Sequence, residues 1–321
     1  MPRISTNLTL SDRAGAWLVR WGIGRLSYLV PAGIYAVGQP TAQDPILVTA
    51  NYKMSFDILR SQLAGRNVWI LVLETNGVNV WCAAGKGTFG THELVRRIER
   101  TGLPQLVSHR RLIVPILGAA GIAAHEVRAL SGFEVCYATV RAGDLPEFFD
   151  NGMITTPNMR QMTFTLRERL ILIPVELMLS LKPLALIGFL LLIVPLLLGL
   201  PTAGFQMMAA FYAAALTGLA VTPILLPWLP GRYFSCKGAV AGLALVLGYY
   251  FIGPKSDHEM FIIPAAVLIL PAVSAFYALN FTGCTPFTSS SGVKKEMLIA
   301  LPIMGGGILV GTVLALVGIF L

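Results

Sequence analysis

Charged residues are scarce in this sequence, and most of them lie in its first half. Only 12% of the 321 residues are Asp, Glu, Lys or Arg, whereas a typical soluble domain has roughly 25%. Residues 1–169 hold 18 of the 24 Lys and Arg and 12 of the 16 Asp and Glu. The sequence therefore predicts a water-soluble first half and a second half that belongs in lipid.

Cysteine is also rare, and Cys82, Cys136, Cys236 and Cys284 form no CxxC pair. This spacing excludes the common zinc and iron–sulfur ligand sets and a small disulfide framework. A reducing compartment is expected, with Cys136 in the core of a strand. Residues 1–17 lack the apolar centre of a signal peptide.

The formal net charge of +8 does not indicate nucleic-acid binding. The basic residues are scattered, and no run of Lys and Arg with interleaved aromatics is present. No nucleic-acid partner is expected.

Long apolar runs fill the second half. A spanning helix needs about 20 mostly apolar residues, and five candidates are present. They lie within 171–200, 203–226, 238–253, 261–281 and 297–321, the first broken by Lys182-Pro183. Glu176 and Lys182 are the intramembrane charges, and both are expected to extend towards the membrane interface.

The loops that carry Lys and Arg alternate with neutral or acidic loops. Arg160, Arg167 and Arg169 precede the first span, and the basic residues of two later loops are Arg232, Lys237, Lys294 and Lys295. The positive-inside rule then predicts a multi-pass protein of the cytoplasmic membrane, with the first half in the cytoplasm and the C-terminus outside.

Short apolar runs alternate with helical patterns between residues 45 and 152. Strands are expected at 45–50, 67–74, 112–117 and 133–140, with helices at 55–65, 92–102, 123–132 and 142–152. This alternation predicts an α/β, Rossmann-like, mostly parallel sheet. The predicted domains are 1–165, with a poorly defined segment at 1–44, and 166–321, an all-α transmembrane domain. Residues 17–38 are expected to pack on the first domain or to lie at the membrane surface.

A single cysteine follows the second predicted strand in the stretch GVNVWCAAGKGTFGT. Ligands of such folds bind beyond the carboxyl ends of the strands, so Cys82 belongs to the binding edge. Residues 85–90 match G-x-G-x-x-G, but they lie too far from the strand for a dinucleotide site. The stretch also fails the phosphate-loop pattern.

Asn79 is a good N-cap for a short helix that Gly85 or Gly87 ends. Cys82 then lies in the first turn, where a helix N-terminus favours a thiolate. Gly85 lies one turn further along the same face, and Ala83 and Ala84 are small, so a flat ligand could approach closely. Cys82 could be an axial metal ligand beneath a planar macrocycle, a reactive nucleophile or a packed core residue.

The eight residues NVWCAAGK, Asn79 to Lys86, match every position of the cap-helix motif of the HgcA family, the membrane-bound corrinoid proteins of microbial mercury methylation. The resemblance extends to LVTANYKMSFD, GFEVCYATVRAGDLPEF and NFTGCTPFTSSSGV, and covers most of the chain. The first half also resembles the corrinoid domain of the corrinoid iron–sulfur protein of acetyl-CoA synthesis.

The resemblance implies a cobalamin-type corrinoid with its own base displaced and Cys82 as the lower axial ligand of cobalt. It implies a corrinoid-dependent methyltransferase that passes methyl from cobalt to Hg(II), forming methylmercury. A ferredoxin-like partner of the HgcB type with two [4Fe–4S] clusters would donate electrons. The methyl donor would be linked to the methyl-tetrahydrofolate pathway.

Further residues are expected to hold the cofactor. Lys86 would contact its amides or phosphate, Thr49 and Asn51 would line the pocket, and Thr88, Gly90 and Thr91 would offer backbone N–H groups to the phosphate. The full predicted set is Thr49, Asn51, Asn79, Val80, Trp81, Cys82, Ala83, Ala84, Gly85, Lys86, Thr88, Gly90 and Thr91.

Two other functions remain open. One is a membrane-anchored corrinoid methyl carrier of one-carbon metabolism of the acetyl-CoA pathway type. The other is a thiol metal-binding or transport protein without corrinoid, which uses Cys82, Cys236 and Cys284. Soft thiolates bind soft metals, so Cys236 and Cys284 are also predicted as transient Hg(II) ligands.

Overall fold

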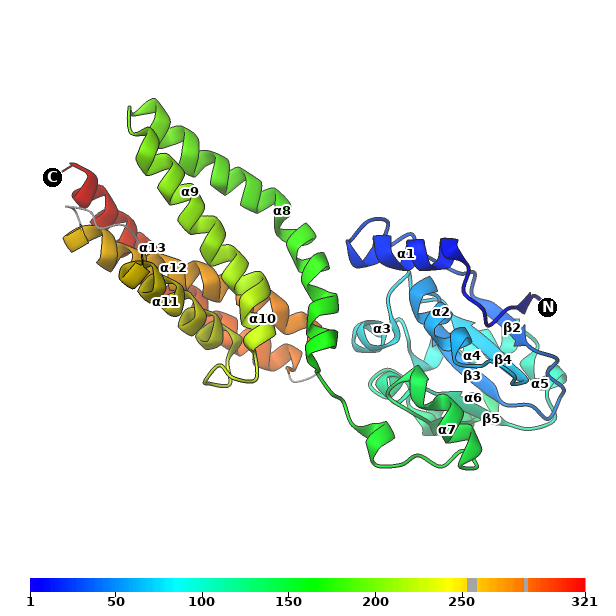
Figure 1. Cartoon of the computed structure of the whole chain (residues 1–321). Helices are drawn as coiled ribbons and strands as arrows, with labels where there is room; N and C mark the ends of the chain where they lie inside the picture. Colours follow the sequence, from blue (N-terminus) through cyan, green and yellow to red (C-terminus); the bar gives the residue numbers. More distant parts are fainter. Residues whose placement is uncertain (253–258, 286–287, 321) are drawn as a thin grey trace. The chain divides into compact units, whose positions relative to one another are not determined.

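A computed structural model describes residues 1–252, 259–285 and 288–320 of the chain. The chain divides into two compact units, Met1–Met162 and Thr163–Leu321. The first is an α/β unit and the second is helical (Figure 1). The division falls three residues before the predicted domain boundary at 165.

A six-stranded sheet organises the α/β unit in the order β1-β2-β4-β3-β5-β6. Strands β3 to β6 run parallel to one another, as the alternating pattern predicts. Strand β2 is antiparallel to β4 and parallel to β1, so the sheet is mixed at one edge. The strands are β1 Arg3–Ile4, β2 Gly33–Val37, β3 Ile46–Ala50, β4 Val68–Leu73, β5 Arg111–Val114 and β6 Glu134–Tyr137.

Strand β2 and the helix α1 that precedes it replace the single amphipathic segment predicted at 17–38. The helix ends at Arg20, and Gly22 and Gly24 adopt positive φ in the turn that follows. Residues 33–37 then pair with β4 along their whole length. The strand escaped prediction because its five residues lie between Pro31 and Gly38 and are too few to show a period.

Helices cover both faces of the sheet. Every residue of β3 and β4 is buried, as expected for strands covered on both sides. The helices of the unit are α1 Leu10–Arg20, α2 Lys53–Ser61, α3 Val80–Lys86, α4 Thr91–Arg100, α5 Leu103–Leu106, α6 Ala124–Ser131 and α7 Leu145–Asp150. Asp144 stands at the N-cap of α7, but its side chain makes no capping hydrogen bond.

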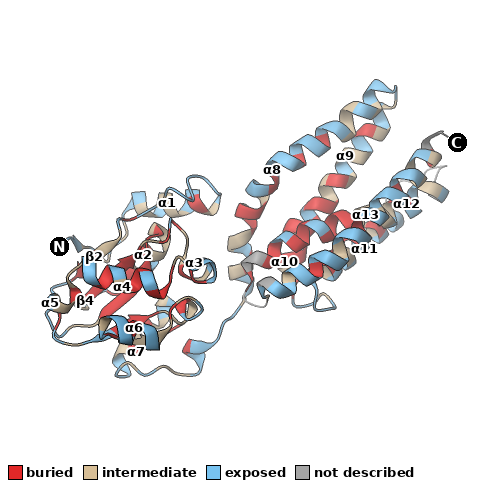
Figure 2. Cartoon of the chain, turned by 180° about the vertical axis from the view of Figure 1, so that it is seen from behind, coloured by how far each residue is buried: buried red, intermediate tan, exposed pale blue. Residues whose placement is uncertain are grey.

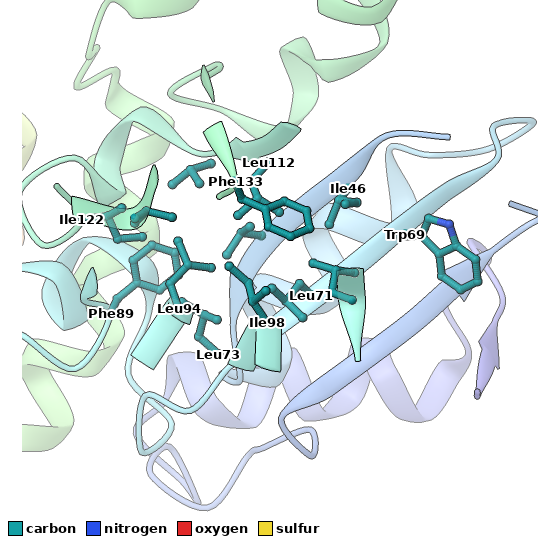
Figure 3. Close-up of a cluster of buried hydrophobic side chains, with 14 of the residues drawn as sticks. Ile46, Trp69, Leu71, Leu73, Phe89, Leu94, Ile98, Leu112, Ile122 and Phe133 are labelled. Carbon is teal, nitrogen blue, oxygen red and sulfur yellow. The ribbon is translucent and has the colours of Figure 1, made fainter. Parts of the chain in front are cut away.

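Two hydrophobic clusters lie on opposite faces of the sheet. One joins Leu71 and Leu73 to Leu94 and Ile98 of α4 and to Phe133, as Figure 3 shows. The other joins Ile70 and Val72 to side chains of α2 and α7. Alternate residues of β4 thus pack into different clusters. This holds the strand in place between the helices on the two faces of the sheet.

The second unit is built from long apolar helices: α8 Leu166–Leu197, α9 Pro201–Leu216, α10 Thr222–Leu225, α11 Phe234–Ile252, α12 Glu259–Asn280 and α13 Ser290–Phe320. A π-helical turn, Thr217–Val221, joins α9 to α10. Much of their outer surface is exposed (Figure 2). Many of the exposed side chains there are large and apolar. Such a surface is unfavourable in water and suits lipid.

Among the residues that the structure describes, five segments are long and apolar enough to cross a membrane, which agrees with the predicted number. They are Leu166–Leu197, Pro201–Leu225, Phe234–Ile252, Met260–Asn280 and Ser291–Gly318. The predicted break at Lys182-Pro183 is wrong, because α8 continues through Pro174, Pro183 and Pro195. A proline removes one helical hydrogen bond without necessarily ending a helix in an apolar bundle.

The buried charges of this unit differ from the sequence expectation. Lys182 is exposed, but Glu176 is buried. Arg169 is also buried and donates hydrogen bonds to the carbonyls of Pro223 and Ile224, at 3.0 and 2.6 Å. Glu296, which the sequence did not single out, accepts from the N–H and hydroxyl of Ser235 at 2.7 and 2.8 Å.

Candidate functional site

The short helix α3 follows β4 after a turn. Asn79 is its N-cap, and its side-chain oxygen accepts the N–H of Cys82 at 2.9 Å. At the other end Gly87 adopts φ 81°, a left-handed conformation that glycine tolerates best, and closes the helix. The predicted cap and glycine stop are therefore both present, and they define a helix of seven residues.

The two faces of α3 have different environments. Val80, Ala83 and Ala84 are buried in the hydrophobic cluster on that side of the sheet. Cys82, Gly85 and Lys86 are exposed. This corrects the assignment of Ala83 and Ala84 to the ligand face, because the helical period turns them towards the sheet when Cys82 faces outward.

The exposed face of α3 is open. A Cβ atom built on Gly85 would meet nothing within 4 Å. Trp81, one residue before the cysteine, is half-buried. The face thus presents a free thiol one turn away from a residue without a side chain.

Asn51, predicted to line the pocket, is instead a buried connector. Its side-chain oxygen accepts from the N–H of Thr75 at 3.1 Å, from its hydroxyl at 2.8 Å and from the N–H of Gly77 at 3.1 Å. Its amide group donates to Glu74. These bonds tie the end of β3 to the turn that starts α3, so Asn51 fixes where Cys82 lies.

Glu93 of α4 supports the same turn, since its carboxylate accepts the N–H of Glu74 at 2.9 Å. It also accepts from Arg97 at 2.7 Å and pairs with Arg96. Burial raises the pKa of Glu93, but the N–H of Glu74 and the two guanidinium groups outweigh it and bring the pKa below its ordinary value.

The polar groups of Thr91 also form hydrogen bonds within the protein. Its N–H donates to the carbonyl of Gly121 at 3.1 Å, and its hydroxyl accepts the N–H of Ala123 at 2.9 Å. Its predicted contact with a cofactor phosphate is therefore not retained. The hydroxyl of Thr88 lies 3.4 Å from the carbonyl of Ala83, and Gly90 is the buried N-cap of α4.

A cavity of about 320 Å³ lies at the carboxyl ends of three parallel strands. Thr49 of β3, predicted for this position, lines it together with Asn79, Val80 and Trp81. Cys82 is not among the lining residues and points to the exposed side. The remaining lining residues are Leu47, Val48, Tyr52, Met54, Ser55, Ile58, Leu59, Ile113, Pro115, Leu117, Ala138, Thr139, Val140, Ala142 and Leu145.

The residues that sequence reasoning missed come from the starts of helices and the ends of strands. Ser55 lies in the first turn of α2, and Pro115 and Thr139 follow β5 and β6. The signal that could have found Pro115 and Thr139 is their position just beyond a strand of a parallel sheet. The lining is mainly apolar, and its few hydroxyl groups suit an organic ligand with polar substituents.

The comparison with protein-family models matches part of the α/β unit. The sequence model of the CdhD family, described as CO dehydrogenase/acetyl-CoA synthase delta subunit, matches residues 26–147. Residues 26–147 are thus similar to a subunit of the acetyl-CoA pathway type. The match contains β2 to β6 and the whole of α3.

Individual relatives agree with this similarity. Acetyl-CoA decarbonylase/synthase complex subunit gamma of Methanopyrus kandleri is 30% identical over 123 residues, 38% of this chain and 26% of the relative. Those of Methanocaldococcus jannaschii and Archaeoglobus fulgidus are each 32% identical over 28% of this chain, and the match covers 19% and 20% of them. The chain therefore spans about a quarter or less of the curated relatives it matches.

These names correct the functional prediction. The resemblance to a corrinoid domain of acetyl-CoA synthesis is confirmed, but the specific resemblance to HgcA is not shown. Mercury methylation is contradicted, because the relatives are named as subunits of acetyl-CoA decarbonylase/synthase complexes. That naming favours the alternative, a methyl carrier of one-carbon metabolism. Hg(II) and the HgcB-type partner have no support.

The other cysteines do not form a metal centre in the described part of the chain. No group of three or more His, Cys, Asp or Glu there could hold a metal ion. Cys136 is only half-buried, because β6 is an edge strand. Cys236 is exposed, and the side chain of Cys284 lies outside the described residues. Their predicted relay of Hg(II) is withdrawn together with mercury methylation.

Proposed function

We propose that the chain is a membrane-anchored corrinoid protein that carries methyl groups in one-carbon metabolism of the acetyl-CoA pathway type. The observation that carries the proposal is the exposed thiol of Cys82 on a capped helix, within the segment similar to the acetyl-CoA pathway subunits. The five apolar helices would hold this domain at a membrane.

The residues at this edge fit a corrinoid. Gly85 leaves open space on the face of α3 that bears Cys82, and a planar macrocycle needs such a clearing. The adjacent cavity is lined mainly by apolar groups, and its lining includes the hydroxyl-bearing residues Thr49, Ser55 and Thr139. A bound corrinoid would supply the cobalt centre on which a methyl group is carried from donor to acceptor.

The roles of the residues follow from their positions. Cys82 would bind the cobalt of the corrinoid through its thiol, because this thiol is exposed and its helix is held at both ends. Asn79 orders the first turn, and the bonds of Asn51 set the position of the turn before it. Trp81 and Thr49 would contact the cofactor from the cavity side. Lys86, which is exposed, would contact its peripheral polar groups.

The test uses the purified full chain in detergent, incubated with aquocobalamin and freed of excess cofactor. Cys82→Ala and Cys236→Ala are compared with wild type, since both cysteines are exposed thiols. Wild type and Cys236→Ala are expected to retain cobalt and share one visible spectrum. Cys82→Ala is expected to show a changed spectrum, because the thiolate ligand is gone.

The outcomes are distinct. Wild type that retains no cobalt overturns the corrinoid proposal, and an unchanged spectrum in Cys82→Ala overturns the ligand role. Methyl carriage is tested by supplying the cobalt-loaded chain with a labelled methyl-tetrahydropterin and its methyltransferase. Label that never reaches the chain contradicts the carrier role.

We also propose that the α/β unit faces the cytoplasm and that the C-terminus lies outside. Arg160 precedes the first spanning helix, Arg167 lies in its first turn, and Lys294 and Lys295 lie in the first turns of α13. All are expected on the cytoplasmic side. Protease added to inside-out vesicles should digest the α/β unit, and digestion in right-side-out vesicles instead would reverse the orientation.

A further inference from the structure

Helix α1 has an unusual distribution of polar and apolar side chains. Its inward stripe contains Asp12, Gly15, Ala16 and Val19. Asp12 lies 2.5 Å from the amino group of Lys53 and 2.7 Å from the guanidinium of Arg60. Burial raises the pKa of Asp12, but its bonds to Lys53 and Thr9 outweigh it and keep the pKa far below its ordinary value. The helix is thus held to α2 by ion pairs.

The opposite stripe is apolar and exposed. Residues 10, 14, 17, 18 and 21 share one side of a helix of 3.6 residues per turn. Trp17 is 67% exposed and Leu18 50% exposed, and the rings of Trp17 and Trp21 stack with their centres 6.5 Å apart. An amphipathic helix of a soluble domain normally buries this stripe.

The turn after α1 extends the apolar surface. Ile23 is 53% exposed and Leu26 is 73% exposed. We call the combined surface the tryptophan face, and it consists of Leu10, Ala14, Trp17, Leu18, Trp21, Ile23 and Leu26. An apolar surface grouped in this way usually marks a site of interaction with a partner or a membrane.

The charges beside the tryptophan face are positive. Arg13 and Arg20 lie on one flank of the stripe by helical period, and Arg25 lies in the following turn. Asp12 is the sole acidic residue between residues 1 and 29, and it is engaged with Lys53 and Arg60 on the inward side. The outward surface therefore combines tryptophan, aliphatic groups and arginine.

We propose that the tryptophan face inserts into the interfacial layer of an anionic lipid bilayer. Tryptophan is enriched at membrane interfaces, and arginines beside an apolar stripe bind anionic lipid headgroups. The same chain carries five helices of membrane-spanning length, so the α/β unit would be tethered to a bilayer. The arginines have no outward-facing carboxylate among residues 1–29 beside them, which matches the charge of an anionic leaflet.

The test is trypsin cleavage after Arg20 and Arg25 in the full chain, reconstituted into liposomes and scored on outward-facing molecules. Phosphatidylcholine liposomes are compared with liposomes that also contain phosphatidylglycerol. Cleavage is expected to slow by about tenfold in the anionic liposomes and to recover at high salt. The double variant Trp17→Glu/Trp21→Glu should lose this protection, and Leu130→Glu, at an exposed leucine of α6, should keep it.

Two further measurements keep the proposal open to refutation. Arg13→Gln should reduce the dependence on phosphatidylglycerol without changing cleavage in phosphatidylcholine. Far-ultraviolet circular dichroism checks that the exposed substitutions leave the fold intact. Equal cleavage in detergent and in both liposomes overturns the proposal.

Discussion

The side-chain oxygen of Asn79 accepts the backbone N–H of Cys82 at 2.9 Å, across the first turn of α3. This bond joins the residue that starts the helix to the residue that carries its thiol. The position of the thiol thus depends on a capping interaction and not on a contact of its own, since Cys82 is exposed. Substitutions at the cap should therefore act on the site while leaving the Cys82 thiol itself in place.

Replacement of Asn79 by alanine should loosen α3. Loss of an N-cap side chain costs about 1 kcal/mol, and α3 has only seven residues over which to spread that loss. Hydrogen exchange of the Val80–Lys86 amides should accelerate by roughly five- to tenfold. Asn79→Ser keeps a capping oxygen and should stay near wild type. Equal protection in Asn79→Ala and Asn79→Ser would refute the cap as the stabilising element.

Gly121→Ala should destabilise the junction of α3 and α4. A Cβ atom at Gly121 would lie 2.2 Å from the carbonyl oxygen of Phe89 and 3.0 Å from Cα of Ala84, so backbone must move. Overpacking of this kind costs about 1–3 kcal/mol. Gly143→Ala is the matched control, because its Cβ would meet nothing within 4 Å. Thermal unfolding of the full chain in detergent compares the two, and a similar midpoint for both contradicts the prediction.

Glu93 should make the stability of the α/β unit depend on pH. Its pKa is lower in the folded chain than in the unfolded chain. The stabilisation that its carboxylate contributes is therefore fully present above the unfolded pKa of about 4.3. It is lost as the pH falls through the lower pKa of the folded chain. Glu93→Gln should make the melting temperature depend less on pH between about pH 5 and pH 3.

The control for this prediction is Glu99→Gln, a substitution at an exposed carboxylate of the same helix. It should leave the pH profile close to that of wild type. A Glu93→Gln variant that keeps the wild-type slope would show that other carboxylates cause the acid sensitivity.

Leu71→Ala should test the cluster between β4 and α4. Leu71 is fully buried among Ile46, Leu94, Ile98 and Phe133. Removing such a leucine side chain costs about 2–5 kcal/mol, because the lost contacts leave a cavity. Leu130→Ala, at a leucine that is 56% exposed, should change the free energy of unfolding by less than about 0.5 kcal/mol. Comparable losses for both would mean that the cluster does not dominate stability.

Local patterns predicted much of the fold and the start of the site. The apolar runs that became β3 and β4, the five membrane-length helices and the cap at Asn79 each depend on neighbouring residues. These features are encoded within a few residues, so a single sequence reveals them. Strand β2 was missed because it forms by pairing with β4, which lies about thirty residues further along the chain.

The environment of the site depends on contacts that sequence spacing does not show. Ala83 and Ala84 were placed on the ligand face because they are small, whereas the sheet buries them. Asn51 and Thr91 appeared free to bind a ligand, but Thr75 and Gly121 take their hydrogen bonds. Such partners are distant in sequence, and only the folded arrangement of the strands brings them within reach.

Helix α8 runs through Pro174, Pro183 and Pro195 without ending. Each proline lacks a backbone N–H, so the carbonyl four residues before it does not receive the usual helical hydrogen bond. Helix α8 should therefore bend more easily at its three prolines than in the segments between them. A load at one end would be taken up as bending at these points, and α8 would transmit position along the membrane unit less faithfully than a helix of equal length without prolines.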